Sequence, residues 1–278
     1  EVEMMEEYGL TKAQMYWRRT KINSLGIEKF RREFPSNIDE AFLSSSNLFF
    51  PTDVIDNIDL IDTGRGPDHY YTDARGDDQY AMGVDVASGA GGDYSTITVV
   101  SRTTMQPVYH YRSNTILPHD FADVVWEKYW EFNEPITIVE QNGVGEVIIG
   151  RLREWKLRNI YKDKNGKFWR TNKHNKIAIY DHLRDMLCNE QIGCISKLLW
   201  SELRTVEITE NGVPNAMQKG THDDIIISTA LALWICKIKP APSFFAVRRD
   251  MIEEFKKQTK ARRIKAKGPL PWSPAGGY

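Results

Sequence analysis

The chain has 278 residues, 41% hydrophobic and 27% charged, with a formal net charge of −1, a balance typical of a globular protein with a sizeable core. Its three cysteines form no C-x-x-C pair, which argues against a disulfide framework and a zinc knuckle and fits a reducing compartment. Ile225–Cys236 is an uncharged run of twelve residues, shorter than the roughly 20 residues of a bilayer span, so we expect no membrane partner.

The N-terminal part, Glu1–Phe50, is predicted to be helical and connecting. Apolar residues recur at helical spacing in Thr11–Arg19 and Ile27–Phe34. The chain starts at Glu1 with no signal-peptide pattern, so we expect a piece of a longer protein. Gly64–Asp78, rich in glycine and aspartate, predicts a loop.

The middle of the chain combines strand and helix patterns. Strands are predicted at Tyr80–Val86, Thr96–Ser101, Pro107–Tyr111, Ile136–Glu140 and Ile160–Tyr161. Helices are predicted at His119–Phe132, Gly145–Trp155, His174–Leu187, Ser196–Arg204 and Asp223–Lys237. The Asn-Gly pair within Thr205–Gln218 indicates an added β-hairpin. Three meandering strands followed by alternating helices and strands predict a mixed α/β sheet with helices on its faces.

The C-terminal tail, residues 241–278, is proline-rich and basic, and we expect low order there. Arg248–Lys267 carries nine Lys or Arg residues against three acids. This excess favours a polyanion such as DNA as a partner. A solubilising tail and a docking peptide for another protein remain alternatives.

Three places in the chain combine a carboxylate with a position where a carboxylate is unfavourable. Asp85 interrupts the apolar run of a predicted strand. Glu140 ends the predicted strand Ile136–Glu140, at the sheet edge where open α/β sheets bind ligands. Asp223 and Asp224 begin the last predicted helix.

Each acid also has a plain structural interpretation. Asp85 could start the glycine-rich turn, Glu140 could hold the turn after it, and Thr221-x-x-Asp224 matches a capping box. Convergence of three acids, however, requires a cation to offset their repulsion. An all-oxygen ligand set suits Mg²⁺ or Mn²⁺, and two such ions support phosphodiester hydrolysis.

This arrangement resembles the ribonuclease-H-like nuclease domain of the large terminase subunit of tailed bacteriophages. The motif Gly220–Asp224 with its alanine-containing continuation carries much of the resemblance. The segments that look like the family's connector and its pre-helix stretch are Tyr8–Arg19, Phe30–Pro35, Asp39–Phe42 and Lys167–Lys173. The resemblance covers about residues 8–236 and implies a connector at 1–50, a nuclease domain at 51–240 and a tail at 241–278.

The resemblance implies that Asp85, Glu140 and Asp224 are catalytic metal ligands for two Mg²⁺ or Mn²⁺ ions, with Asp223 as a neighbouring ligand. Which of Asp223 and Asp224 is the main ligand stays open. Auxiliary roles are expected for Asp93 and His222. The basic residues expected to contact DNA are Arg170, Lys173, Lys176, Arg204 and Lys219.

The resemblance further implies an endonuclease that cuts concatemeric double-stranded DNA with little sequence preference. Expected partners are DNA, an ATPase domain in cis, a portal protein and a small terminase subunit, in the host cell cytoplasm. A phosphate-loop motif is absent from the chain; the nearest approach, Gly145–Leu152, has an apolar interior and Arg151 in place of the lysine.

Three alternatives remain. Val84–Gly89 resembles the first phosphate loop of sugar kinases and actin-like ATPases, but no second such loop follows. Resolvases and integrases share a triad of acids, although they lack the connector. A non-catalytic DNA-gripping or portal-docking module is the alternative outside enzymes.

Overall fold

The computed structural model describes residues 47–216 and 220–241, except positions 62 and 65, together with residues 9–25 and the single positions 5, 30, 33 and 34. The chain divides into two compact units, Glu1–Phe49 and Phe50–Tyr278. The basic tail, Lys219, the motif Asp39–Phe42 and most of the predicted helix Ile27–Phe34 lie outside the described residues.

In the first unit, helix α2 spans Lys12–Leu25. The Thr11 hydroxyl accepts from the Gln14 amide at 3.3 Å, and the Gln14 side chain accepts from the Thr11 amide at 2.8 Å. This reciprocal capping explains why the helix begins here. The helix predicted over Thr11–Arg19 is therefore confirmed and runs further, to Leu25.

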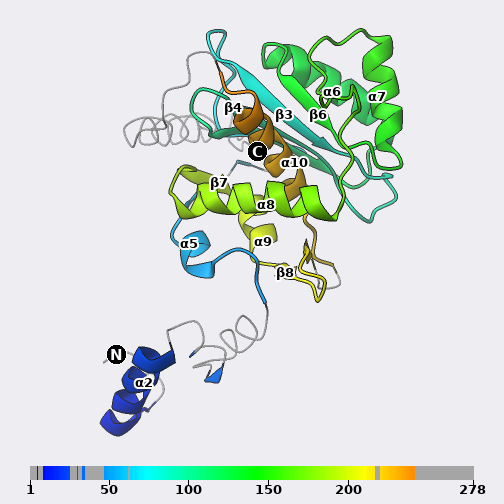
Figure 1. Ribbon diagram of the computed structural model, residues 1–278. Coiled ribbons are helices and arrows are strands. Elements are labelled where there is room, and N and C mark those ends of the chain that lie inside the picture. Colours follow the sequence, from blue (N-terminus) through cyan, green and yellow to red (C-terminus); the bar gives the residue numbers. More distant parts are fainter. Residues whose placement is uncertain are drawn as a thin grey trace, which may run out of the picture. The chain divides into compact units, whose positions relative to one another are not determined.

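The second unit is built on a five-stranded sheet of order β2-β5-β4-β3-β6. Its strands are β2 (Asp68–Tyr70), β3 (Tyr80–Asp85), β4 (Ser95–Ser101), β5 (Pro107–Ser113) and β6 (Ile136–Val139). Strand β6 runs parallel to β3, and the other pairs are antiparallel. Figure 1 shows α6 (Pro118–Glu131) and α7 (Gly145–Glu154) on one face of this sheet and α10 (Asp224–Ile238) on the other. The predicted mixed α/β sheet with helices on its faces is confirmed.

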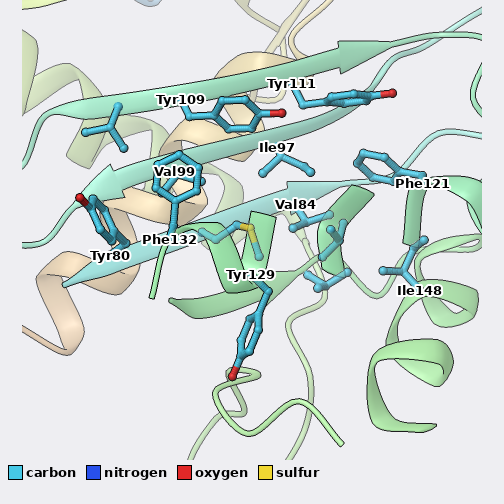
Figure 2. Close-up of a cluster of buried hydrophobic side chains, with 14 of the residues drawn as sticks. Tyr80, Val84, Ile97, Val99, Tyr109, Tyr111, Phe121, Tyr129, Phe132 and Ile148 are labelled. Carbon is cyan, nitrogen blue, oxygen red and sulfur yellow. The ribbon is translucent and has the colours of Figure 1, made fainter. Parts of the chain in front are cut away.

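The hydrophobic core lies between the sheet and α6 and α7. Alternate residues of β3, β4 and β5 point to this face, and Figure 2 shows them with aromatic and aliphatic side chains of the two helices. The residues labelled there are Tyr80, Val84, Ile97, Val99, Tyr109, Tyr111, Phe121, Tyr129, Phe132 and Ile148. Since Val84 points to this core, its neighbour Asp85 points to the opposite face, where α10 lies.

Helix α10 packs unusually close to the sheet at Gly83. A Cβ atom on Gly83 would lie 2.0 Å from the carbonyl oxygen of Ser228, so only glycine allows this approach. A buried polar network fixes the helix beside it: the Thr98 hydroxyl contacts those of Ser228 at 2.9 Å and Thr229 at 3.1 Å, and His110 Nδ1 at 2.8 Å. Thr98 is the β4 partner of Gly83, so close approach and polar pairing coincide.

The remaining elements lie on the side of α10 that faces away from the sheet, where α8 and α9 pack against the helix. They are α5 (Thr52–Asp56), β1 (Asp59–Ile61), α8 (Lys173–Cys188), β7 (Cys194–Ser196), α9 (Lys197–Leu203), β8 (Val206–Ile208) and β9 (Pro214–Ala216). Strands β1 and β7 pair in parallel, and β8 and β9 form the predicted hairpin. Within the described part of the chain, every helix is too short or too polar to cross a bilayer.

Two local predictions are wrong. The predicted loop Gly64–Asp78 contains β2, which pairs with β5 at the edge of the sheet, because a three-residue edge strand depends on its partner rather than on its own pattern. The predicted strand Ile160–Tyr161 is reduced to a single bridge between Thr137 and Ile160.

The close approach at Gly83 generates a test of stability. Gly83→Ala should lower the free energy of unfolding by about 1–3 kcal/mol, because the added methyl group forces α10 away from β3. The measurement is chemical denaturation of the parent and the variant. Gly76→Ala is the matched control, since a Cβ there meets no atom within 4 Å; equal losses in both variants would contradict this account.

Candidate metal centre

Two of the predicted acids meet at one edge of the sheet. Asp85 is the last residue of β3, and Glu140 directly follows β6. The two strands are parallel and pair Val84 with Val139, so the next residues of both strands lie side by side. The Glu140 amide donates to the Val84 carbonyl at 3.1 Å, which holds the end of β6 against β3.

Asp224, the first residue of α10, joins them on the face of the sheet to which the Asp85 side chain points. Thr96, the β4 partner of Asp85, donates its hydroxyl to the Asp224 carbonyl at 2.8 Å. The Tyr94 amide donates to Asp224 Oδ2 at 3.1 Å. The helix start is therefore attached to β4 beside Asp85, and Asp224 is only 6% exposed.

The electrostatics of the cluster disfavour three negative charges. Desolvation raises the pKa of Asp85 well above its ordinary value, and the carboxylates of Glu140 and Asp224 raise it further. Desolvation likewise raises the pKa of Asp224 to about 7, partly offset by the Tyr94 amide. Bound protons or a nearby cation would relieve this repulsion. Carboxylate oxygens are hard donors, so the residues present fit Mg²⁺ or Mn²⁺.

The backbone around Glu140 is tightly packed. A Cβ on Gly145 would lie 1.9 Å from the Glu140 carbonyl oxygen, so the start of α7 rests directly on this residue. The Asn142 side-chain amide donates to Glu140 Oε1. Glu140 is 6% exposed, and these contacts hold its side chain in one orientation.

Asp223 is oriented differently from Asp224. Its Oδ2 accepts from Lys176 Nζ at 2.9 Å and from the Tyr180 hydroxyl at 2.8 Å, both on α8. Asp223 is the N-cap residue of α10 but makes no side-chain capping bond. The capping-box interpretation of Thr221 and Asp224 is therefore wrong, because the helix starts two residues later than it requires.

The auxiliary candidates lie on the outer side of Asp224. His222 Nδ1 is 3.5 Å from Asp224 Oδ2 and 3.7 Å from Asp93 Oδ1. The three side chains bring one donor atom each within 4.8 Å of one another. Asp93 is on the exposed turn, and the His222 ring packs edge-on against Tyr94, with 4.9 Å between ring centroids.

The basic candidates have different environments. Arg170 is exposed and lies 3.7 Å from Glu146, and Lys173 is exposed at the start of α8. Lys176 bridges Asp223 and Asn215 of the hairpin. Arg204 pairs with Asp56 at 2.8 Å and packs over Trp200. The structure thus brings Lys176 next to the acids and ties Arg204 to α5.

Sequence reasoning missed Glu202 and Arg112. Glu202 is 4% exposed, and burial raises its pKa to about 8, opposed by the charge of Arg112. It contacts the first turn of α10, next to Asp224. Both residues lie in ordinary helix and strand patterns, so no local signal marks them.

Comparison with solved structures defines the class of fold. The chain has the ribonuclease-H-like fold of large terminase nuclease domains. No protein-family model matches the sequence of the chain. The large terminase nuclease of thermophilic phage G20c, solved with bound magnesium and with bound cobalt, has a TM-score of 0.57 and 24% identity over 68% of this chain and 97% of that one. The Thermus phage P74-26 large terminase nuclease domain has a TM-score of 0.51 and 21% identity over 64% and 91% of the respective chains.

The raised pKa values predict how stability depends on pH. The folded protein holds the Asp224 proton up to about pH 7, whereas the unfolded chain releases it near pH 4. This contribution to metal-free stability is therefore complete below pH 4 and is lost as the pH rises to about 7. Asp224→Asn should gain stability over the parent between pH 5 and about pH 8, measured by thermal unfolding in chelator.

Added Mn²⁺ should oppose this loss of stability at high pH. It should raise the thermal midpoint of the parent more at about pH 8 than at about pH 5, because protons compete with the cation for the carboxylates. If Mn²⁺ leaves the thermal midpoint of the parent unchanged at both pH values, the assignment of a metal centre is contradicted.

Proposed function

We propose that the chain is the nuclease domain of a viral DNA-packaging terminase, acting as a metal-dependent endonuclease that cuts concatemeric double-stranded DNA. The observation that carries this proposal is the convergence of Asp85, Glu140 and Asp224 at one sheet edge, with raised pKa values for Asp85 and Asp224. The fold shared with terminase nucleases supports it, as does the magnesium bound to the phage G20c nuclease.

In this proposal Asp85, Glu140 and Asp224 hold two Mg²⁺ or Mn²⁺ ions through their carboxylate oxygens. When bound, such ions activate a water molecule and neutralise the leaving oxygen of the phosphodiester. The protein orients the ligands: the Asn142 amide holds Glu140, and the Tyr94 amide holds Asp224. His222 and Asp93 act as auxiliary groups beside Asp224.

Binding of the DNA backbone is assigned to basic side chains around the acids. Exposed Arg170 and Lys173 and the bridging Lys176 lie at the start of α8 or just before it. Lys219, the basic tail and Arg204, which directly follows α9, are expected to add to this contact. Phosphate contacts carry little sequence information, which accounts for weak sequence preference. An ATPase domain in cis, a portal protein and a small terminase subunit are the proposed partners, in the host cell cytoplasm.

The first test removes the central acid. Asp85→Asn should lower Mn²⁺-dependent plasmid nicking by at least about 100-fold, in line with the cost of losing a central catalytic group. The thermal midpoint in chelator should stay equal or rise, because one of the repelling charges is gone. Nicking and thermal unfolding of the same preparation provide both readouts.

Asp120→Asn is the control for this test. Asp120 belongs to an exposed group with His119 and Asp123 that also brings three potential ligands together. Its loss should leave nicking unchanged. Full activity in Asp85→Asn would sink the nuclease assignment and leave the non-catalytic DNA-gripping module as the explanation.

The second test separates the two adjacent aspartates. Asp224→Asn should abolish nicking, because this carboxylate is the one beside Asp85. Asp223→Asn should cost about tenfold or less, because its carboxylate orients Lys176 and Tyr180. Initial rates against Mn²⁺ concentration measure both. Equal losses in the two variants would show that Asp223 is a metal ligand of the same rank.

A further inference from the structure

The start of α10 is capped by a residue from another helix. Glu202 Oε2, on α9, accepts from the amides of Ile225 at 2.9 Å and Ile226 at 3.2 Å. These amides belong to the first turn, where a helix lacks internal acceptors. The N-cap residue Asp223 makes no side-chain capping bond, so Glu202 supplies the acceptor that the helix start requires.

A second chain of contacts reaches Asp224 from β5. Arg112 Nη2 donates to Glu202 Oε1 at 3.4 Å. The Arg112 guanidinium also lies over the Tyr94 ring, 3.5 Å from its centroid. The amide of the same Tyr94 donates to Asp224 Oδ2. Arg112 thus connects the cap of α10 to the residue that holds the Asp224 carboxylate.

These contacts form a closed ring around one acid. From Glu202 the ring runs through the amides of Ile225 and Ile226 to the backbone of Asp224. From Arg112 it runs through Tyr94 to the Asp224 side chain. Both the position of the backbone and the rotamer of the carboxylate depend on this ring.

We infer that Glu202 and Arg112 are positioning residues that hold the Asp224 carboxylate in its metal-binding orientation. The inference rests on the proposed role of Asp224 as a metal ligand. Partners that orient metal ligands typically contribute about 10- to 100-fold to metal affinity. Glu202 and Arg112 act through Tyr94 and the helix start, without touching the cation themselves.

The charges of Glu202 and Arg112 allow positioning of Asp224 to be distinguished from a direct electrostatic effect on the bound cation. By electrostatics alone, removing an ionised Glu202 would weaken cation binding and removing a protonated Glu202 would leave it nearly unchanged, whereas removing the positive Arg112 would strengthen it. Loss of positioning weakens binding in both cases. The sign of the effect at Arg112 therefore discriminates between the two explanations.

The experiment is calorimetric titration of Mn²⁺ into the full 278-residue chain, without DNA, at a temperature where all variants are folded. Glu202→Gln and Arg112→Gln should each raise the Mn²⁺ dissociation constant about tenfold. The double variant should bind little worse than the weaker single variant, because both residues act in one ring. Arg112→Lys, which keeps the charge but loses the planar group over Tyr94, should also bind more weakly.

Lys128→Gln is the matched control. Lys128 is a buried cation on α6, with Nζ 2.8 Å from Glu131 Oε2 and 2.6 Å from the Tyr70 hydroxyl. Its loss removes a comparable ion pair on the other side of the sheet, so Mn²⁺ affinity should not change. A thermal midpoint for every variant separates lost stability from lost positioning. If Glu202→Gln does not fold, the two Arg112 variants carry the test.

Unchanged or tighter Mn²⁺ binding in Arg112→Gln overturns the inference, and so does an equal loss in Lys128→Gln. A parent that binds Mn²⁺ but does not nick DNA would refute the proposed nuclease function alone, because the readout here is metal binding. A parent that binds no Mn²⁺ would refute both.

Discussion

The close packing of α10 on the centre of the sheet is the constraint on which the rest of the structure depends. Gly83 allows the helix backbone to reach the sheet, and the hydroxyl network of Thr98 fixes it there. An apolar helix alone slides and rotates with little cost, whereas buried hydroxyl pairs specify one position. That position brings the first residue of α10 to the end of β3, where Asp85 lies.

The cluster of acids that this packing creates lowers the stability of the folded protein. Buried carboxylates near one another raise their own pKa values, as at Asp85 and Asp224, and in the absence of a cation they weaken the folded state at neutral pH. The surrounding fold offsets this cost. The hydrophobic core on the opposite face of the same strands is one cluster of buried side chains that includes Tyr80, Val84 and Phe132. Burial there is worth roughly 1.5–3 kcal/mol for each large apolar side chain.

Two neighbouring aspartates at a helix start have separate environments here. Asp224 lies among the other acids and accepts from the amide of Tyr94, the residue just before β4. Asp223 accepts from Lys176 and Tyr180 of α8, and Lys176 also reaches Asn215 of the hairpin. Neither side chain caps the helix, and Glu202 takes that role from α9. The start of α10 is thus a junction where four elements meet around one predicted ligand.

The sequence by itself determined the order of the main strands and helices and the residue types of the site. The apolar run of β3 and the longer apolar run of α10 are local patterns, so Tyr80–Val86 and Asp223–Lys237 were predictable within a few residues. The positions of Asp85, Glu140 and Asp224 at element ends were equally readable. The tertiary structure decided which of these meet and how. It set Asp223 against Lys176, added β2 to the sheet edge and brought Glu202 and Arg112 to the start of α10. Such contacts join residues far apart in the chain, and no local periodicity encodes them, because a side chain's partner depends on the packing of whole elements.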